Sequence, residues 1–270
     1  MRSNQFAPFL SGISAIDPTF STDGRWVAYT SYPDHTLWRS RTDGTDRLQL
    51  TYPPTQVSYP FISPDGKQVS FTTRDGIYLV AMDGGTPRRI ADNNSFIATW
   101  SPDGNYLAYN LSIDDKTAKE GAVYELRTFD VRNSTVSVVP LSRGITDAQW
   151  VTHDTLIAAK DADTIQQVML ILFDLKTGKW TKLVSGDLVN WALSADRKHL
   201  YYTIGGDEPK AMRIRFSDHK IEEITSLKAL RRVSDPVDNN TQITVAPDGS
   251  PVFTRDIGTQ EIYALTVKWP

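Results

Sequence analysis

One short phrase recurs along this chain and constrains its fold more than any other feature. It consists of an apolar residue, then Ser-Pro-Asp-Gly or a close variant, then an alternating apolar run. Three clear copies and three weaker ones lie at 20–24, 62–66, 100–104, 150–154, 193–197 and 245–249. Their interval of about 40 to 50 residues is that of one four-stranded β-propeller blade. We therefore predict a single all-β domain over residues 1–270.

The second repeat shows how one unit is built. Residues 59–63 are the expected first strand, and 64–66 turn the chain, because Pro fixes φ and Gly accepts a positive φ. Residues 67–72 alternate as a second strand, and 77–82 and 87–91 flank an Asp-Gly turn. Each unit is thus predicted to be a four-stranded antiparallel sheet.

The last of the six predicted units is short, since only three strand signals precede the end of the chain. A leading segment at 4–11 belongs to no unit, and we expect it to complete the last blade as its fourth strand. That pairing would remove exposed sheet edges. The predicted blades are approximately 15–51, 58–91, 96–140, 146–185, 189–227 and 240–270.

Composition and charge exclude several classes of function. The formal net charge of −3 provides no basic field for nucleic acid. The chain has no cysteine, so it has neither a disulfide framework nor a thiolate metal site. No signal peptide and no run of about 18 apolar residues are found. We expect a monomeric domain that neither binds nucleic acid nor inserts into a membrane.

The Ser-Pro-Asp-Gly turn followed by an Asp-Gly hairpin resembles the propeller repeat of the TolB family, the periplasmic component of the Tol envelope system. The resemblance covers essentially the whole chain. It is closest to propellers that end bacterial proteins with a winged-helix or Ser/Thr kinase domain. It implies a six-bladed fold in an extracytoplasmic, envelope-associated or signalling protein, but similar blades also serve in hydrolysis and sugar-chain lysis. The residues that carry it are 8–14, 37–44 and 258–265.

Residues suited to catalysis do not form a recognisable pattern. The repeated Asp of each turn is explained by capping of that turn through its side chain. None of the four histidines, at positions 35, 153, 199 and 219, has a second histidine at metal-ligand spacing. No serine-hydrolase elbow or phosphate-binding glycine motif occurs. We predict no catalytic residue, no metal and no cofactor; a Ca²⁺ ion in the central channel stays open as an unsupported alternative.

A ligand of a propeller would lie on the face where loops lead into the first strands and join the second and third strands. This channel-mouth face combines both charge signs with aromatic side chains, which suits a protein or peptide partner. We predict a non-catalytic binding or sensing module. The alternatives are a carbohydrate- or lactone-acting enzyme at the channel mouth and a structural spacer. The predicted contact residues are Asp17, Tyr32, His35, Tyr59, Arg74, Asp75, Phe96, Asp147, Asn190, Asn240 and Arg255.

Overall fold

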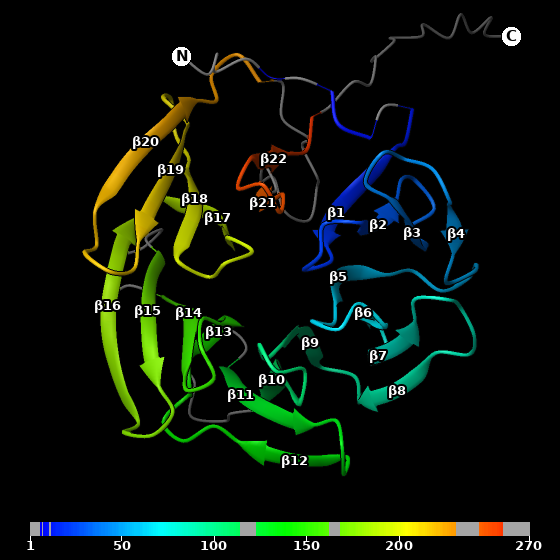
Figure 1. The fold of residues 1–270 in the computed structure, drawn as a ribbon. Coiled ribbons are helices and arrows are strands. Elements are labelled where there is room, and N and C mark those ends of the chain that lie inside the picture. Colours follow the sequence, from blue (N-terminus) through cyan, green and yellow to red (C-terminus); the bar gives the residue numbers. More distant parts are fainter. Residues whose placement is uncertain are drawn as a thin grey trace, which may run out of the picture.

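The chain folds as an all-β propeller in the computed structural model (Figure 1). The structure describes residues 6, 8–10, 12–113, 123–161, 168–230 and 243–255. Within these ranges lie five four-stranded antiparallel sheets and one two-stranded sheet, arranged around a ring. The described ranges contain no helix long and apolar enough to cross a membrane.

The strands of each blade pair in chain order, and in Figure 1 the first strand of each sheet lies nearest the centre of the ring. Blades 1 and 2 comprise β1 (Ala15–Phe20), β2 (Trp26–Ser31), β3 (Leu37–Arg41), β4 (Leu48–Gln49), β5 (Ser58–Ile62), β6 (Gln68–Thr73), β7 (Gly76–Ala81) and β8 (Arg88–Ala91). Blade 3 comprises β9 (Ser95–Trp100), β10 (Tyr106–Ile113), β11 (Val123–Asp130) and β12 (Thr135–Val138). Blades 4 and 5 comprise β13 (Ile145–Trp150), β14 (Thr155–Asp161), β15 (Val168–Asp174), β16 (Lys179–Gly186), β17 (Leu188–Leu193), β18 (His199–Ile204), β19 (Lys210–Arg215) and β20 (Ile221–Ser226). The two-stranded sheet comprises β21 (Ile243–Val245) and β22 (Pro251–Phe253).

The hydrophobic core lies between the blades rather than within them. Four apolar clusters each combine side chains of two successive blades, so each sheet buries its faces against its neighbours. Each cluster contains a fully buried side chain from each of its two blades. These pairs are Leu37 and Phe71, Ile77 and Leu107, Leu126 and Leu156, and Ile157 and Leu200.

The predicted count of six blades and the predicted closing strand at 4–11 are both wrong for the described residues. Five sheets have four strands, and β21 and β22 form a two-stranded sheet between blade 5 and blade 1 (Figure 1). Phe6 and residues 8–10 belong to no strand. Leu10 has a φ of 50°, which lies outside the β region, and Pro8 has no N–H to donate to a neighbouring strand. The third strand expected for the last unit, at 261–268, lies outside the described residues.

Aromatic contacts take the place of the predicted strand pairing at this junction. The ring of Phe6 lies edge-on to Phe253 of β22, with 5.9 Å between the ring centroids. Phe9 packs in the same way against Phe20 of β1, at 5.6 Å. Farther along the seam, a Cβ added to Gly24 would lie 3.1 Å from Pro247, so the two hairpin turns are in close contact and a side chain at Gly24 would require Pro247 to shift. Phe6 and Phe9 therefore pack on the two sides of the junction, and neither belongs to a strand.

The recurring Ser-Pro-Asp-Gly phrase has a structural role in each turn. In blade 2, the Ser63 hydroxyl donates to Asp65 Oδ1 at 2.6 Å and accepts from the amide of Gln68 at 2.9 Å. Asp65 Oδ1 also accepts from the amide of Lys67 at 3.0 Å. The serine–aspartate bond recurs in blades 1, 3 and 5. The prediction that each Asp caps its own turn is therefore confirmed in these blades.

These turns make part of the stability depend on pH. The hydrogen bond from Ser21, followed by that from the amide of Arg25, lowers the pKa of Asp23 from 3.8 to about 2. Because the folded-state pKa is the lower one, this contribution is present above pH 4 and is lost as the pH falls toward 2. Asp23→Asn should reduce the free energy of unfolding by about 1 kcal/mol at pH 7, allowing for solvent screening. Urea titrations of both proteins from pH 7 to pH 2 should show the difference shrinking; a difference that does not vary with pH would contradict this role.

Candidate binding face at the channel mouth

The first strands of four blades share one backbone irregularity. Asp17, Tyr59, Ile97 and Asp147 have φ values of 53°, 52°, 53° and 56°, and the strand register shifts at each of them. Residues other than glycine seldom adopt this left-handed conformation, and a β-branched residue such as Ile97 does so least readily. Each of these residues precedes the apolar residue of the repeated phrase by the same interval. Four blades therefore place a strained residue, here called the bulge residue, at equivalent positions around the ring.

Side chains from the preceding blade hold these bulges in place. In three blades the amide of the bulge residue donates to an oxygen of the blade before it, so the irregular strand does not leave this donor unpaired. The bonds run from Tyr59 N to Asp17 Oδ2 (3.4 Å), from Ile97 N to Thr72 Oγ1 (3.1 Å) and from Asp147 N to Asn110 Oδ1 (2.9 Å).

Buried polar side chains hold the adjacent carbonyls in the same way. The bonds run from Ser70 Oγ to the carbonyl of Ala98 (2.7 Å), from Thr99 Oγ1 to that of Ala148 (2.7 Å) and from Asn110 Nδ2 to that of Ile145 (2.8 Å). Asn110 is fully buried and bonds blade 4 through both its amide oxygen and its amide nitrogen. Satisfied buried networks of this kind make a local structure rigid. The inner strands of blades 2 to 4 are thus fixed to one another beside the bulges.

The bulges include three of the predicted contact residues and one that the sequence analysis missed. Asp17, Tyr59 and Asp147 are bulge residues, and each is half-buried. In blade 3 the bulge residue is Ile97, whereas the predicted Phe96 lies one position earlier and packs against Tyr124 at 5.2 Å. Counting back from the apolar residue of each repeat, by the interval that separates Asp147 from Trp150, would have identified Ile97.

Blade 5 departs from this pattern. Asn190 pairs directly with Thr203, and the register shift lies before it, between Leu188 and Asn190. Its side-chain oxygen accepts from the amide of Trp191 at 3.0 Å. The predicted contact residue Asn240 lies outside the described residues. The equivalence of the innermost strands is therefore seen in blades 1 to 4.

The loop residues of the prediction lie at the same ends of the blades as the starts of the first strands. Antiparallel pairing places the β2–β3 loop, with Tyr32 and His35, and the β6–β7 turn, with Arg74 and Asp75, at this end. Tyr32 is 57 % exposed and its ring lies 6.0 Å from that of His35. Arg255 follows β22 and is exposed. The structure thus brings those predicted first-strand and loop residues that it describes to one end of the blades.

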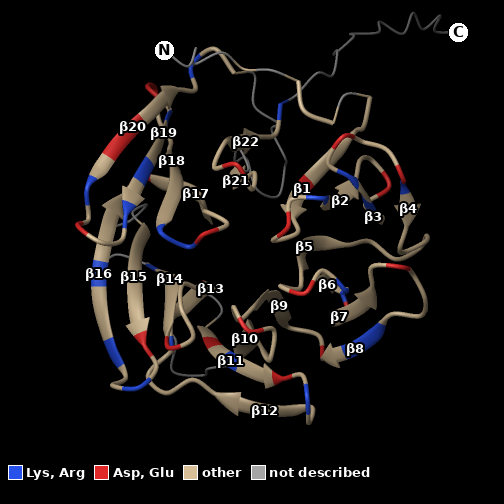
Figure 2. Cartoon of the chain, in the orientation of Figure 1, with Lys and Arg blue, Asp and Glu red and all other residues tan. Residues whose placement is uncertain are grey.

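Charge on this face is mixed and does not concentrate into a metal site. Figure 2 shows acidic and basic residues distributed over all the blades of the ring. In the described part of the chain, no group of three or more His, Asp or Glu residues could hold a metal ion. Asp17 and Asp147 stand on blades 1 and 4, with blades 2 and 3 between them. Among the described residues, this face presents single acidic, aromatic and aliphatic side chains.

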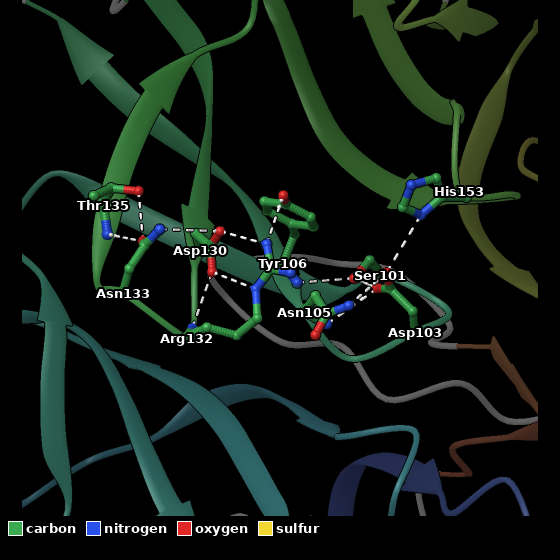
Figure 3. A network of polar contacts seen from close by, with 9 residues as sticks. All are labelled: Ser101, Asp103, Asn105, Tyr106, Asp130, Arg132, Asn133, Thr135 and His153. Carbon is green, nitrogen blue, oxygen red and sulfur yellow. Dashed lines mark hydrogen bonds and ion pairs between the residues drawn. The ribbon is translucent and has the colours of Figure 1, made fainter.

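The opposite end of blade 3 carries a polar network that has a structural explanation (Figure 3). Arg132 donates to both carboxylate oxygens of Asp130 and to the hydroxyl of Tyr106. The bond from Arg132 lowers the pKa of Asp130 to about 2. Nearby, His153 Nδ1 of blade 4 lies 3.4 Å from the Oδ2 atom of Asp103, the aspartate of a blade 3 turn. His153 therefore links two blades and lies far in the fold from the loop of His35.

Comparison with known proteins shows a fold but no family. No family model matches the chain. A segment of 111 residues is 31 % identical to an uncharacterized protein of Agrobacterium fabrum and covers 34 % of this chain and 38 % of that protein. Another segment, of 135 residues, is 27 % identical to an uncharacterized peptidase of Bacillus subtilis. It covers 42 % of this chain and 20 % of that protein. The matched segments thus span less than two fifths of these relatives.

Solved structures match over almost the whole chain at low sequence identity. A TolB-type protein of Agrobacterium tumefaciens has a TM-score of 0.69 at 15 % identity, covering 90 % of both chains. TolB of Acinetobacter baumannii has a TM-score of 0.65 at 18 % identity, covering 89 % of this chain and 58 % of that one. Oligogalacturonate lyase of Vibrio parahaemolyticus has a TM-score of 0.64 at 10 % identity, covering 92 % of this chain and 90 % of that one. The expected likeness to propellers of winged-helix or kinase proteins gains no support, and the chain has a TolB-like β-propeller fold.

Proposed function

We propose that this chain is a non-catalytic propeller that binds a protein or peptide partner through its channel-mouth face. The observation that carries the proposal is the set of bulge residues, Asp17, Tyr59, Ile97 and Asp147, held at equivalent positions of four blades. Strained backbone conformations are found mainly at functional sites, and they persist only where the surrounding structure holds them in place. Here the hydrogen bonds from the bulge amides to side chains of the preceding blade hold them.

The chemistry of the face suits recognition of another polypeptide. An exposed tyrosine and a mixture of charge signs resemble the composition of protein interfaces, in which aromatic and Arg side chains contribute most of the affinity. Tyr32 and Arg74 are exposed on the surrounding loops, and the bulge carboxylates lie deeper. A partner with basic and apolar side chains would meet complementary groups. The rigid support would reduce the entropy lost on binding.

The other function classes have less support. The likeness to oligogalacturonate lyase is at 10 % identity and concerns the fold alone. The carboxylates of the bulges are divided between separate blades, whereas hydrolysis of a glycosidic bond uses a close pair. The proposal treats residues 1–270 as one monomeric domain of a larger, extracytoplasmic signalling or envelope-associated protein, in line with the resemblance noted above.

A mouth variant tests the proposal directly. Tyr32→Ala, Arg74→Ala and Asp147→Asn together should abolish or weaken by at least about tenfold the capture of a partner from source-cell extract. Partners should be identified by mass spectrometry, and each affinity should then be measured with the purified protein. The substitutions remove exposed or half-buried groups, and Asn tolerates the left-handed conformation at position 147.

The matched control changes three residues in the hairpin turns at the opposite end of the blades. Lys67→Ala, Asp83→Ala and His219→Asn should leave the affinity unchanged. Circular dichroism and thermal unfolding establish that both variants fold. Equal loss in the two variants, or loss only in the control, would refute the mouth as the interface. If the folded wild-type protein captures no partner from the extract, the binding proposal fails and the structural-spacer alternative is favoured.

The support beneath the face can be tested separately. Asn110→Ala removes an acceptor for the amide of Asp147 and a donor to the carbonyl of Ile145, and Asn110 is fully buried. Leaving buried polar groups of blade 4 unpaired should lower the free energy of unfolding by about 2 to 4 kcal/mol. Asn105→Ala, in an exposed turn of the same blade, is the control. Chemical denaturation measures both, and a change below about 1 kcal/mol for Asn110→Ala would show that these bonds contribute little.

A further inference from the structure

The outer strands of the five four-stranded sheets each form an edge of the sheet, and four of these edges have features that oppose further pairing. β4 has only two residues, β8 contains two arginines, β16 two lysines and β20 two glutamates. The ladders of β8, β16 and β20 also contain a register shift. Short length, charge and irregular pairing protect a sheet edge from the addition of another strand.

β12, the outer strand of blade 3, lacks these features. It has the sequence Thr-Val-Ser-Val, contains no charged residue and pairs with β11 in continuous register over all four positions. All four residues are exposed, Val136 by 45 % and Val138 by 50 %. Figure 2 shows β12 without charge along its length, whereas β8 is basic and β20 acidic. β12 is therefore an unprotected edge with two exposed valines.

The backbone of β12 directs hydrogen-bonding groups outward at the same two valines. The amide of Val139 donates to the carbonyl of Leu126 of β11 at 2.9 Å. Because backbone groups alternate in direction along an antiparallel strand, the N–H and C=O groups of Val136 and Val138 point away from β11. An extended chain laid along β12 would meet two donors and two acceptors there.

The two valines lie on the face of blade 3 that is turned toward blade 2. Val136 pairs with Phe129 of β11, and residues that pair across a ladder lie on the same face of the sheet. Phe129 is buried in the apolar cluster that also contains Ile77 of blade 2. Val136 and Val138 therefore continue this apolar face outward to the edge of the sheet.

One cation lies over this face without an acidic partner. The guanidinium carbon of Arg88 of β8 lies 5.9 Å from the ring centroid of Phe129, and Arg88 is exposed. Within the part of the chain that the structure describes, Arg88 forms no ion pair. Its neighbour Arg89, in contrast, lies 3.2 Å from Asp92 Oδ1. A carboxylate held beside Val136 would thus meet an available cation.

A second copy of this chain would not supply that carboxylate. If two β12 strands paired through their outward groups, Val136 of each would lie opposite Val138 of the other. The side chains that the copy presented on the Arg88 side would then be valines. Charge complementarity therefore favours an acidic segment of a different protein.

We propose that an extended segment of a partner protein adds to β12 as a further strand of blade 3. The segment would have an apolar β-branched side chain beside Val138 and a carboxylate side chain beside Val136, within reach of Arg88. Strand addition of this kind gains affinity from main-chain hydrogen bonds and specificity from alternate side chains. The proposal concerns the outer edge of blade 3 and is independent of the function assigned to the channel-mouth face.

The test uses the whole chain and the peptide acetyl-Thr-Val-Thr-Glu-Thr-amide as the probe. In antiparallel register its valine lies beside Val138 and its glutamate beside Val136. The two amide signals are followed by ¹H–¹⁵N NMR of protein labelled with ¹⁵N-valine, and Val136→Ile and Val138→Ile identify them. Both signals should shift saturably, with a Kd on the order of 1 mM for a peptide of this size.

Two changes test the pairing of the backbones. A peptide that is N-methylated at its valine and glutamate keeps both side chains but cannot donate to the carbonyls of Val138 and Val136, so it should not bind. Val136→Pro removes an outward N–H and leaves the bonds to β11 intact, as proline does at sheet edges. It should weaken the unmodified peptide about three- to tenfold. Circular dichroism and thermal unfolding establish that the variant folds.

A matched pair of variants tests the charge. A peptide with glutamine in place of glutamate should bind the wild-type protein about two- to fivefold more weakly, because Arg88 loses its partner. Arg88→Gln should abolish this difference between the two peptides. Arg89→Gln removes the same charge from the same strand and should preserve the difference.

Three outcomes would overturn the proposal. One is equal binding of the N-methylated peptide, which would exclude strand addition. The second is a preference for glutamate over glutamine that persists in Arg88→Gln. The third is the absence of any shift of the Val136 and Val138 signals well above the expected Kd. If sedimentation then shows dimers that Val136→Pro dissociates, the occupant of β12 is a second copy of this chain.

Discussion

The packing of each blade against its neighbours is the interaction on which the rest of the structure depends. A four-stranded sheet with two apolar faces cannot stay folded in water alone, and these sheets bury those faces only in the seams. Polar groups are satisfied across the same seams, as Asn110 shows by bonding blade 4 from blade 3. Blade 5 and the two-stranded sheet share a smaller cluster that includes Tyr201 and Ile243, and aromatic contacts follow at the junction with blade 1.

Local turn chemistry made most of the blades predictable, whereas their closure was not. The hydroxyl and carboxylate of the repeated phrase fold back on the same turn, so sequence alone locates the hairpins. The first strand of the second blade was expected at 59–63, and β5 spans Ser58–Ile62. Closure depends on contacts distant in sequence. Removal of exposed sheet edges favoured a strand at 4–11, but the positive φ of Leu10 is incompatible with a strand there, and the rings of Phe6 and Phe9 pack at the junction instead.

Bulge residues show where residue type fails as a guide to conformation. Propensity favours Asn and Asp in the left-handed region, which agrees with Asp17 and Asp147 but not with Ile97. Ile97 adopts this conformation where its amide donates to Thr72 of the preceding blade, a contact invisible to local propensity. Conversely, Asn190 suits the left-handed region by type but pairs regularly with Thr203. Position within the repeat predicts the bulge better than identity, because the neighbouring blade imposes it.

The space between neighbouring blades widens with distance from the axis of the ring, and side chains have to fill it. Different seams contain different side chains in this outer part. Between blades 1 and 2, the guanidinium of Arg39 lies 4.3 Å from the ring centroid of Trp26, and Asp46 neutralises it. Beside blade 4, Arg143, Lys160 and Lys182 line a hollow together with Ile145, Ile171 and Trp180. Near the axis the seams are narrow enough for direct hydrogen bonds, which fix the bulges in place. The divergence of the blades therefore allows direct hydrogen bonds between blades near the axis and requires larger side chains farther out.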